Sequence, residues 1–271
     1  MIAILGACTP FDDTEELELY EQELRSLAIG GEVLPATAHT YGDGGGRTGG
    51  DWIVNGLSSP AVSGVNPAHP LGSSQGLGMA GWLGQGDLEG EDVIRYMVEC
   101  ALDTGDSVTV SDGTNSFTFD GMMGLAPEWK TQTCNQDCQQ WISACLMART
   151  NATGAEVQLF VQGDHSALGF GGAPGFPHYE ATFFGNVFED PAPMHVCVGS
   201  VTGMIAAEQH GRTCALNEDE CGFTIHQDCV VDAGCGESAT GVATIDCQPE
   251  PSLPSFHGIS VNVAPPEGGP S

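Results

Sequence analysis

Residues 134–150, CNQDCQQWISACLMART, carry the pattern on which the fold of this 271-residue chain depends. The bulky apolar side chains recur at steps of three and four residues, the spacing that places them on one face of an α-helix: Cys138, Trp141, Ile142, Cys145 and Leu146. Cys134 lies one turn earlier on the same side. The segment therefore predicts a helix with cysteines on its buried face.

A second helix is predicted at residues 90–102, GEDVIRYMVECAL, where apolar residues recur at the same steps. Acidic residues fill its first turn, where they favour the positive end of the helix dipole, and a glycine follows shortly after its end. Cys100 lies on the apolar stripe of this helix, as Cys145 does on the other. Two helices packed through these stripes allow a bridge between Cys100 and Cys145, which leaves Cys134 and Cys138 to close locally.

The rest of the folded sequence has the patterns of strands and turns. Alternating valine and phenylalanine residues on either side of Asp112-Gly113 predict a hairpin over residues 107–119. Other strands are expected at 155–163, 194–199 and, as a short one, 257–263, with a buried aromatic segment at 179–188. We therefore expect an α+β fold: a single disulfide-rich globular domain in which two principal helices pack on short antiparallel strands, with a flexible N-terminal arm.

The cysteines indicate how the fold is stabilised. Ten of the 11 lie between residues 100 and 247, and the chain has no CxxC, CxxCH or HExxH motif that would favour a metal or haem site. We therefore expect five disulfides, which require an oxidising compartment, and no metal or other cofactor. Bridges in the segment 214–247 would compensate for its few large apolar residues. The ten cysteines are Cys100, Cys134, Cys138, Cys145, Cys197, Cys214, Cys221, Cys229, Cys235 and Cys247.

Cys8 is the odd cysteine, and the residues before it suggest a lipid anchor. The run Leu5-Gly6-Ala7-Cys8 resembles a bacterial lipobox, in which small residues allow cleavage before a cysteine that then carries acyl chains. Seven residues are too few for a complete signal peptide, so this interpretation places the true start upstream. A buried free thiol at Cys8 is the alternative.

The charge of the chain excludes several classes of partner. With 36 acidic and 6 basic residues the formal net charge is -30, so the protein has no means of neutralising the phosphates of a nucleic acid. The same charge disfavours anionic lipid surfaces. We therefore expect membrane contact only through a lipid anchor at Cys8, and an unknown protein or glycan as ligand.

The composition suggests four parts along the chain. Residues 1–8 are the expected remnant of the lipoprotein signal and lipobox. Residues 9–88 form an acidic and then Gly/Ser/Pro-rich tether, and 89–248 the disulfide-rich globular domain. Residues 249–271 form a Pro/Gly-rich tail.

Candidate catalytic residues are few. Asp164 and His165, with His178, flank a glycine-rich loop and are weak candidates for a hydrolase pocket, although isolated surface histidines are more common. Residues 72–76, GSSQG, match the G-x-S-x-G pattern around Ser74 but lack the preceding strand and following helix that a nucleophile elbow needs. No catalytic residue is therefore assigned.

Sugar binding would need exposed aromatic rings. Trp141 belongs to the predicted core, and Trp52 and Trp82 lie in the tether. Trp129 is therefore the one ring expected to be exposed.

Several segments together resemble a known group of proteins: IVNGLSSPA at 53–61, IRYMVECAL at 94–102, GLAPEW at 124–129, WISACLMARTNATGAEVQLFVQGDHSAL at 141–168 and ATFFGNVF at 181–188. They are similar to the cysteine-rich secreted lipoproteins, mostly uncharacterised, that myxobacteria and related predators encode in many copies. The resemblance covers roughly residues 52–247. It implies a secreted or surface location in a bacterium and brings no catalytic residues to transfer.

The expected function is that of an extracellular or cell-surface lipoprotein with a binding or structural role at the outer envelope of a bacterium. A secreted hydrolase with a pocket near Asp164 and His165 is the first alternative. A carbohydrate-binding module is the second.

Overall fold

The computed structural model describes residues 32–37, 65–77, 88–111, 114–151, 156–171, 173–216, 221–238 and 244–266. Cys8, Trp52 and Trp82, which the sequence analysis singled out, lie outside these residues. Within them, no helix has both the length and the apolar content needed to cross a membrane.

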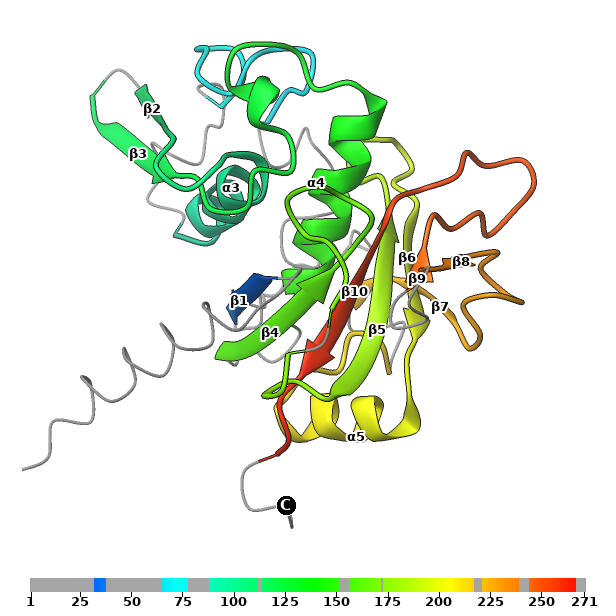
Figure 1. Cartoon of the computed structure of the whole chain (residues 1–271). Coiled ribbons are helices and arrows are strands. Elements are labelled where there is room, and N and C mark those ends of the chain that lie inside the picture. Colours follow the sequence, from blue (N-terminus) through cyan, green and yellow to red (C-terminus); the bar gives the residue numbers. More distant parts are fainter. Residues whose placement is uncertain are drawn as a thin grey trace, which may run out of the picture.

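The largest element of the molecule is a mixed six-stranded sheet (Figure 1). The order is β1-β4-β10-β5-β6-β7, and all neighbours are antiparallel except β6 and β7, which are parallel. The strands are β1 (Glu32–Thr37), β4 (Glu156–Gln162), β10 (Gly258–Val263), β5 (His178–Gly185), β6 (Met194–Val198) and β7 (Thr224–His226). The last strand in sequence, β10, therefore lies between two earlier ones.

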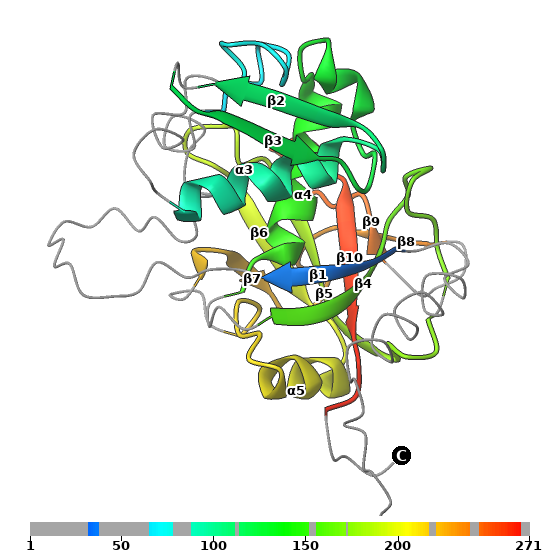
Figure 2. The same ribbon diagram turned by 90° about the vertical axis from the view of Figure 1, so that its left-hand side faces the viewer.

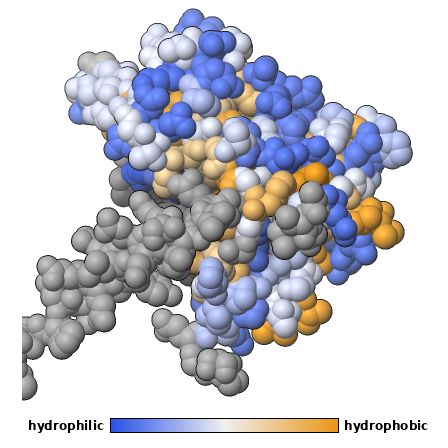
Figure 3. All heavy atoms as spheres, viewed as in Figure 1, coloured by the Kyte–Doolittle hydropathy of each residue, from blue (hydrophilic) through white to orange (hydrophobic). Residues whose placement is uncertain are grey.

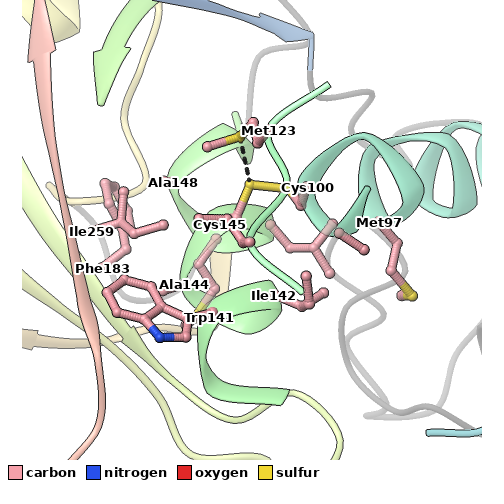
Figure 4. Close-up of a cluster of buried hydrophobic side chains, with 14 of the residues drawn as sticks. Met97, Cys100, Met123, Trp141, Ile142, Ala144, Cys145, Ala148, Phe183 and Ile259 are labelled. Atoms are coloured by element: carbon pink, nitrogen blue, oxygen red, sulfur yellow. Dashed lines mark hydrogen bonds between the residues drawn. A yellow bond between two sulfur atoms is a disulfide. The ribbon is translucent and has the colours of Figure 1, made fainter. Parts of the chain in front are cut away.

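Helix α4 (Gln136–Arg149) crosses one face of this sheet and is buried around almost its whole circumference (Figure 1). It begins at Asn135, whose side chain accepts a hydrogen bond from the backbone N–H of Cys138, as N-cap residues do. Trp141 points to Phe183 and Ile259 of the sheet, whereas Cys145 points the other way (Figure 4). The helix is therefore the middle layer of the fold.

The third layer covers the outer side of α4 (Figure 2). It contains α3 (Leu88–Ala101), the hairpin of β2 (Ser107–Ser111) and β3 (Ser116–Asp120), and the 3-10 helix η1 (Pro127–Lys130). Residues 65–77 belong to the same layer, because the backbone N–H of Leu71 bonds to the carbonyl of Trp129 and the Trp129 indole donates to the carbonyl of His69. This part of the expected tether is packed into the core.

The opposite face of the sheet is covered by cross-linked loops rather than by a helix. Phe184 and Phe256 pack there with the bridges Cys197–Cys229 and Cys235–Cys247. The two short strands of this region are β8 (Gly236–Glu237) and β9 (Thr244–Ile245).

Helix α5 (Val201–Gln209) packs against β5 at one end of the sheet (Figure 1). The approach is close because Gly203 has no side chain: a Cβ there would lie 1.6 Å from the carbonyl oxygen of Tyr179. The bridge Cys214–Cys221 follows the helix.

The expected fold class is wrong in its main element. Two helices were expected to dominate short antiparallel strands, but the sheet is mixed, has six strands, and includes an eight-residue β5. The expected flexible arm also contributes β1 to this sheet. The error has a physical cause, because β10 and β1 are stabilised by pairing with strands about a hundred residues away, which local periodicity cannot report.

The ten cysteines between residues 100 and 247 form five disulfides. Cys100–Cys145 joins α3 to α4, and Cys134–Cys138 closes the start of α4, the two pairings that the helical spacing favoured. In Figure 4 the first bridge lies in the apolar layer between the two helices, next to Met123. The bridges fit an extracellular protein, because reducing compartments rarely maintain so many.

A fully buried ion pair fixes the end of α4 on the sheet. Arg212 and Glu180 are each 1 % exposed, and the guanidinium donates from Nε to both carboxylate oxygens, at 2.9 and 2.8 Å. The same guanidinium donates to the carbonyls of Ala148 and Thr150, which a helix end leaves without partners. Glu180 lies at a β-bulge of β5. Its neighbours Tyr179 and Ala181 pair with the consecutive residues Asn262 and Val261, so Glu180 is the extra residue on its strand.

Glu180→Gln should destabilise the protein strongly, because it leaves the Arg212 charge buried without a counter-charge. The expected loss in the free energy of unfolding is about 3–5 kcal/mol, measured by chemical denaturation. Lys130→Ala is the control: it breaks the ion pair with Asp106, whose members are 35 % and 43 % exposed, and should cost about 0–1 kcal/mol. Equal losses in the two variants would contradict the role given to the buried pair.

The two bridges of α4 should differ in their contribution to stability. Cys100 and Cys145 are 45 residues apart and Cys134 and Cys138 only 4. Loop-closure entropy gives a loss of about 4 kcal/mol for the double alanine variant of the first pair and about 2 kcal/mol for that of the second. Guanidinium unfolding without reductant measures both, and the reverse order would show that the first bridge does not act by restricting the unfolded chain.

Candidate functional site

The most concentrated group of titratable side chains surrounds His257, just before β10. Its Nε2 lies 2.7 Å from Oδ1 of Asp137, and its Nδ1 lies 2.9 Å from Oδ1 of Asp246. The ring stacks on the buried Trp141 at a centroid distance of 4.4 Å and an interplanar angle of 7°. His165 meets the same indole edge-on at 5.0 Å. These five residues are called the Trp141 cluster below.

Three separate parts of the chain position the two carboxylates and His257. Asp137 lies in the first turn of α4, where the helix dipole favours a negative charge. Asp246 has a backbone φ of 34°, a left-handed conformation that costs energy in a residue other than glycine. Its neighbour Cys247 is bridged to Cys235, and two backbone hydrogen bonds of 2.8 Å join Cys247 to Phe256. The Asp246 backbone is thus held in place covalently next to the strand that carries His257.

The hydrogen bonds of His257 use both of its ring nitrogens. An ionised carboxylate can only accept, so both contacts are hydrogen bonds when each nitrogen carries a proton. In that state neither nitrogen has a lone pair, and His257 connects α4, the β9 segment and β10. Both ring nitrogens are therefore engaged in joining these segments.

The lone pair of the neutral His165 ring is already used within the protein. Its Nδ1 accepts the backbone N–H of Ala167 at 3.1 Å, which assigns the proton of the neutral ring to Nε2. Burial lowers the pKa of His165 below its ordinary value of 6.5, and His257 acts in the same direction, whereas Asp137 and Glu128 oppose them. The ring is therefore held neutral with its one lone pair already occupied.

The Trp141 cluster also lacks a nucleophile. None of the contacts that its five side chains make within the described residues involves the side chain of a serine, threonine or cysteine. The described residues likewise contain no group of three or more His, Cys, Asp or Glu side chains arranged to hold a metal ion. The contacts that the structure shows for the cluster join α4, the β9 segment and β10 to one another.

The weak catalytic candidates are only partly brought together. His165 belongs to the Trp141 cluster, and Asp164 beside it is exposed. His178 is paired with Val263 at the far end of β10 from His257. His257 and Val263 are six residues apart, which in an extended strand corresponds to about 20 Å. Because His165 lies near His257, His178 is too far away to act together with it.

Two further candidates are placed by the described chain. Trp129 was expected to be exposed but is completely buried, because its ring packs edge-on against Phe188 and its indole N–H donates to the carbonyl of His69. Ser74 lies in a turn, without a strand before it or a helix directly after it among residues 65–77. Neither residue therefore has the surroundings that its proposed chemistry requires.

Sequence reasoning missed the residues that complete the cluster. Asp137 and His257 are 120 positions apart, and no motif joins them. It also missed a pair of histidines on the opposite face, His195 of β6 and His226 of β7, whose Nδ1 and Nε2 lie 3.1 Å apart. The cue in the sequence is indirect: His195 and His226 each stand two or three residues from a cysteine, and Cys197 and Cys229 are bridged.

A comparison of the chain with protein-family models, curated proteins and solved structures finds no significant match. The function is therefore argued from the cross-links, the charge and the side-chain geometry.

The titration of His165 tests the description of the cluster. Its folded pKa lies below 6.5, so the neutral ring stabilises the fold fully above pH 6.5, and this contribution declines as the pH falls below that value. NMR titration of the ring protons should give a midpoint below 6.5. Asp137→Asn should lower it further, because the Asp137 charge favours the protonated ring. A midpoint at or above 6.5 in the native protein would contradict the burial argument.

Proposed function

We propose that this protein is a disulfide-stabilised extracellular or cell-surface lipoprotein of a bacterium, anchored through Cys8, with a binding or structural role. The observation that carries the proposal is the pairing of all ten cysteines of the described chain. The bridges lie in all three layers, so they would matter wherever the protein must remain folded without chaperones or a reducing buffer.

The chain charge and the resemblance support the location. A net charge of -30 maintains solubility outside the cell and gives no affinity for nucleic acid. The segments within residues 52–247 that resemble cysteine-rich secreted lipoproteins of myxobacteria favour a bacterial envelope. The lipobox-like run before Cys8 supplies the means of attachment.

A role in binding is supported by the surface rather than by a catalytic site. Val230 and Val231, at the tip of the loop between two bridges, are 50 % and 79 % exposed, and Val201 and Ile205 of α5 are 77 % and 50 % exposed. Figure 3 shows hydrophobic side chains at the margins where Figure 1 places α5 and the loops around β8. Exposed apolar side chains that lie next to one another, as Val230 and Val231 do, offer a partner an apolar contact.

Neither alternative gains support from the geometry. A hydrolase near Asp164 and His165 would need a base with a free lone pair, and Ala167 occupies that of His165. A carbohydrate-binding module would need an exposed ring, and Trp129 and Trp141 are both buried.

A count of reactive thiols in denaturant without reductant tests location and anchoring together. The chain has 11 cysteines, of which ten are bridged, so a lipid-modified Cys8 leaves no thiol to react. We expect no reactive thiol in protein extracted from native membranes with detergent, and an intact mass that includes acyl chains.

Cys8→Ser is the matched control. It should also show no thiol, yet it should be released into the medium instead of sedimenting with membranes. A single reactive thiol in the native protein would contradict the anchor but leave the bridges standing. Eleven reactive thiols in protein recovered from the cytoplasm would contradict the whole proposal.

A further inference from the structure

His195 and His226 form a buried pair between the last two strands of the sheet. His195 Nδ1 and His226 Nε2 lie 3.1 Å apart, and both rings stack on Phe184, at centroid distances of 5.3 and 5.9 Å. His195 is only 8 % exposed, and its Nε2 is buried without a hydrogen-bond partner. The surroundings are the apolar cluster that contains Phe256 and the bridge Cys197–Cys229.

Hydrogen-bond accounting assigns the protons of the neutral pair. A buried N–H without an acceptor costs more than a buried lone pair without a donor, so the proton of His195 belongs on Nδ1, which donates to Nε2 of His226. His226 then carries its own proton on Nδ1. The pair is complete only while both rings are uncharged.

An added proton disrupts this arrangement at either ring. On His195 it must go to Nε2, where it places a charge in an apolar cluster with no acceptor. On His226 it goes to Nε2, which can then bond to His195 only as a donor, and this requires the His195 proton to move from Nδ1 to the buried Nε2, where it has no acceptor. The face of Phe184 offers a weak cation–π attraction, which is smaller than the cost of burying an unpaired charge.

We propose that the His195–His226 pair is an acid-sensitive lock that holds β7 against β6 at neutral pH and releases it in acid. Only three residues of β7 pair with β6, and the contact between the two rings adds to this short ladder. The loop that follows β7 carries the exposed Val230 and Val231. Release of β7 would therefore change how this loop is presented to a partner.

The nearby bridges make the release local and reversible. Cys221 before β7 is joined to Cys214, and Cys229 after it is joined to Cys197 of β6. The strand can leave its partner while both of its ends remain covalently attached. Closing again at higher pH then requires no search through the unfolded chain.

The direction and range of the pH effect follow from the surroundings of His195. Burial, and to a smaller extent the neighbouring His226, lower its pKa from 6.5 to about 4. No carboxylate or cationic side chain from β5, β7 or the loop of Phe256 acts on the ring, and His226 is the one titratable group that does so within the described chain. The state in which β7 is released binds more protons between pH 4 and 6.5 than the state in which it is paired with β6. The stability of the paired state therefore decreases as the pH falls through this window.

Hydrogen exchange followed by mass spectrometry tests the lock on the full-length protein. After correction for intrinsic exchange, the exchange of the β7 amides gives the equilibrium constant for opening of the strand. This constant should rise about tenfold for each pH unit below 6.5 until the pH nears 4. Peptides from α4 should not change in the same way, because the release is local. His195→Phe keeps a ring on Phe184 but can neither titrate nor bond to His226, so the protection of its β7, at whatever level it lies, should no longer change between pH 6.5 and 4.

The control is His210→Gln, which removes a histidine elsewhere whose Nε2 contacts the carbonyl of Ala264. It should keep the acid response of β7. If His195→Phe does not fold, nitrogen NMR of the native imidazoles replaces it, and at neutral pH it should find the His195 proton on Nδ1. The proposal is overturned if β7 of the native protein stays protected down to about pH 3.5, if His195→Phe keeps the same pH dependence as the native protein, or if His195 carries its proton on Nε2.

Discussion

The fold depends on the burial of α4 on all sides. A helix with a polar face could rest on the sheet alone, but α4 has apolar side chains toward the sheet and toward α3. It therefore has to be packed on two sides. The sheet packs on one side, and segments distant in the chain, which include residues 65–77, pack on the other. The bridge Cys100–Cys145 joins α3 of this outer layer covalently to α4.

Both arginines near the end of α4 serve the same arrangement. Arg149 reaches outward, where it lies 4.0 Å from the centre of the Tyr96 ring and 2.5 Å from Glu99, both on α3. Arg212 reaches the same helix end from the opposite direction and joins it to Glu180 in the sheet. Two of the 6 basic residues of the chain therefore hold the three layers together.

Histidine acts in three different ways in this protein, and its hydrogen-bond partners decide which. His257 lies between two carboxylates and joins separate segments through them. His165 has a backbone N–H on its lone pair and stays neutral. His195 has another imidazole as partner and an apolar shell, so it can hold a strand only while uncharged. A histidine's position in the sequence shows none of this, because each role depends on atoms supplied by other elements.

The sequence by itself determined the local elements and the use of its cysteines. Helical spacing around Cys100 and Cys145 was enough to predict α3, α4 and the bridge between them, and alternation around Asp112-Gly113 was enough for the hairpin, because these signals arise from neighbours within a few residues. Only the tertiary structure decided that the sheet is the main element, with the tail segment β10 in its middle. It also decided that Trp129 is buried and that Asp137 meets His257. Strand pairing and side-chain convergence join residues far apart in the chain, and their energies have no counterpart in local periodicity.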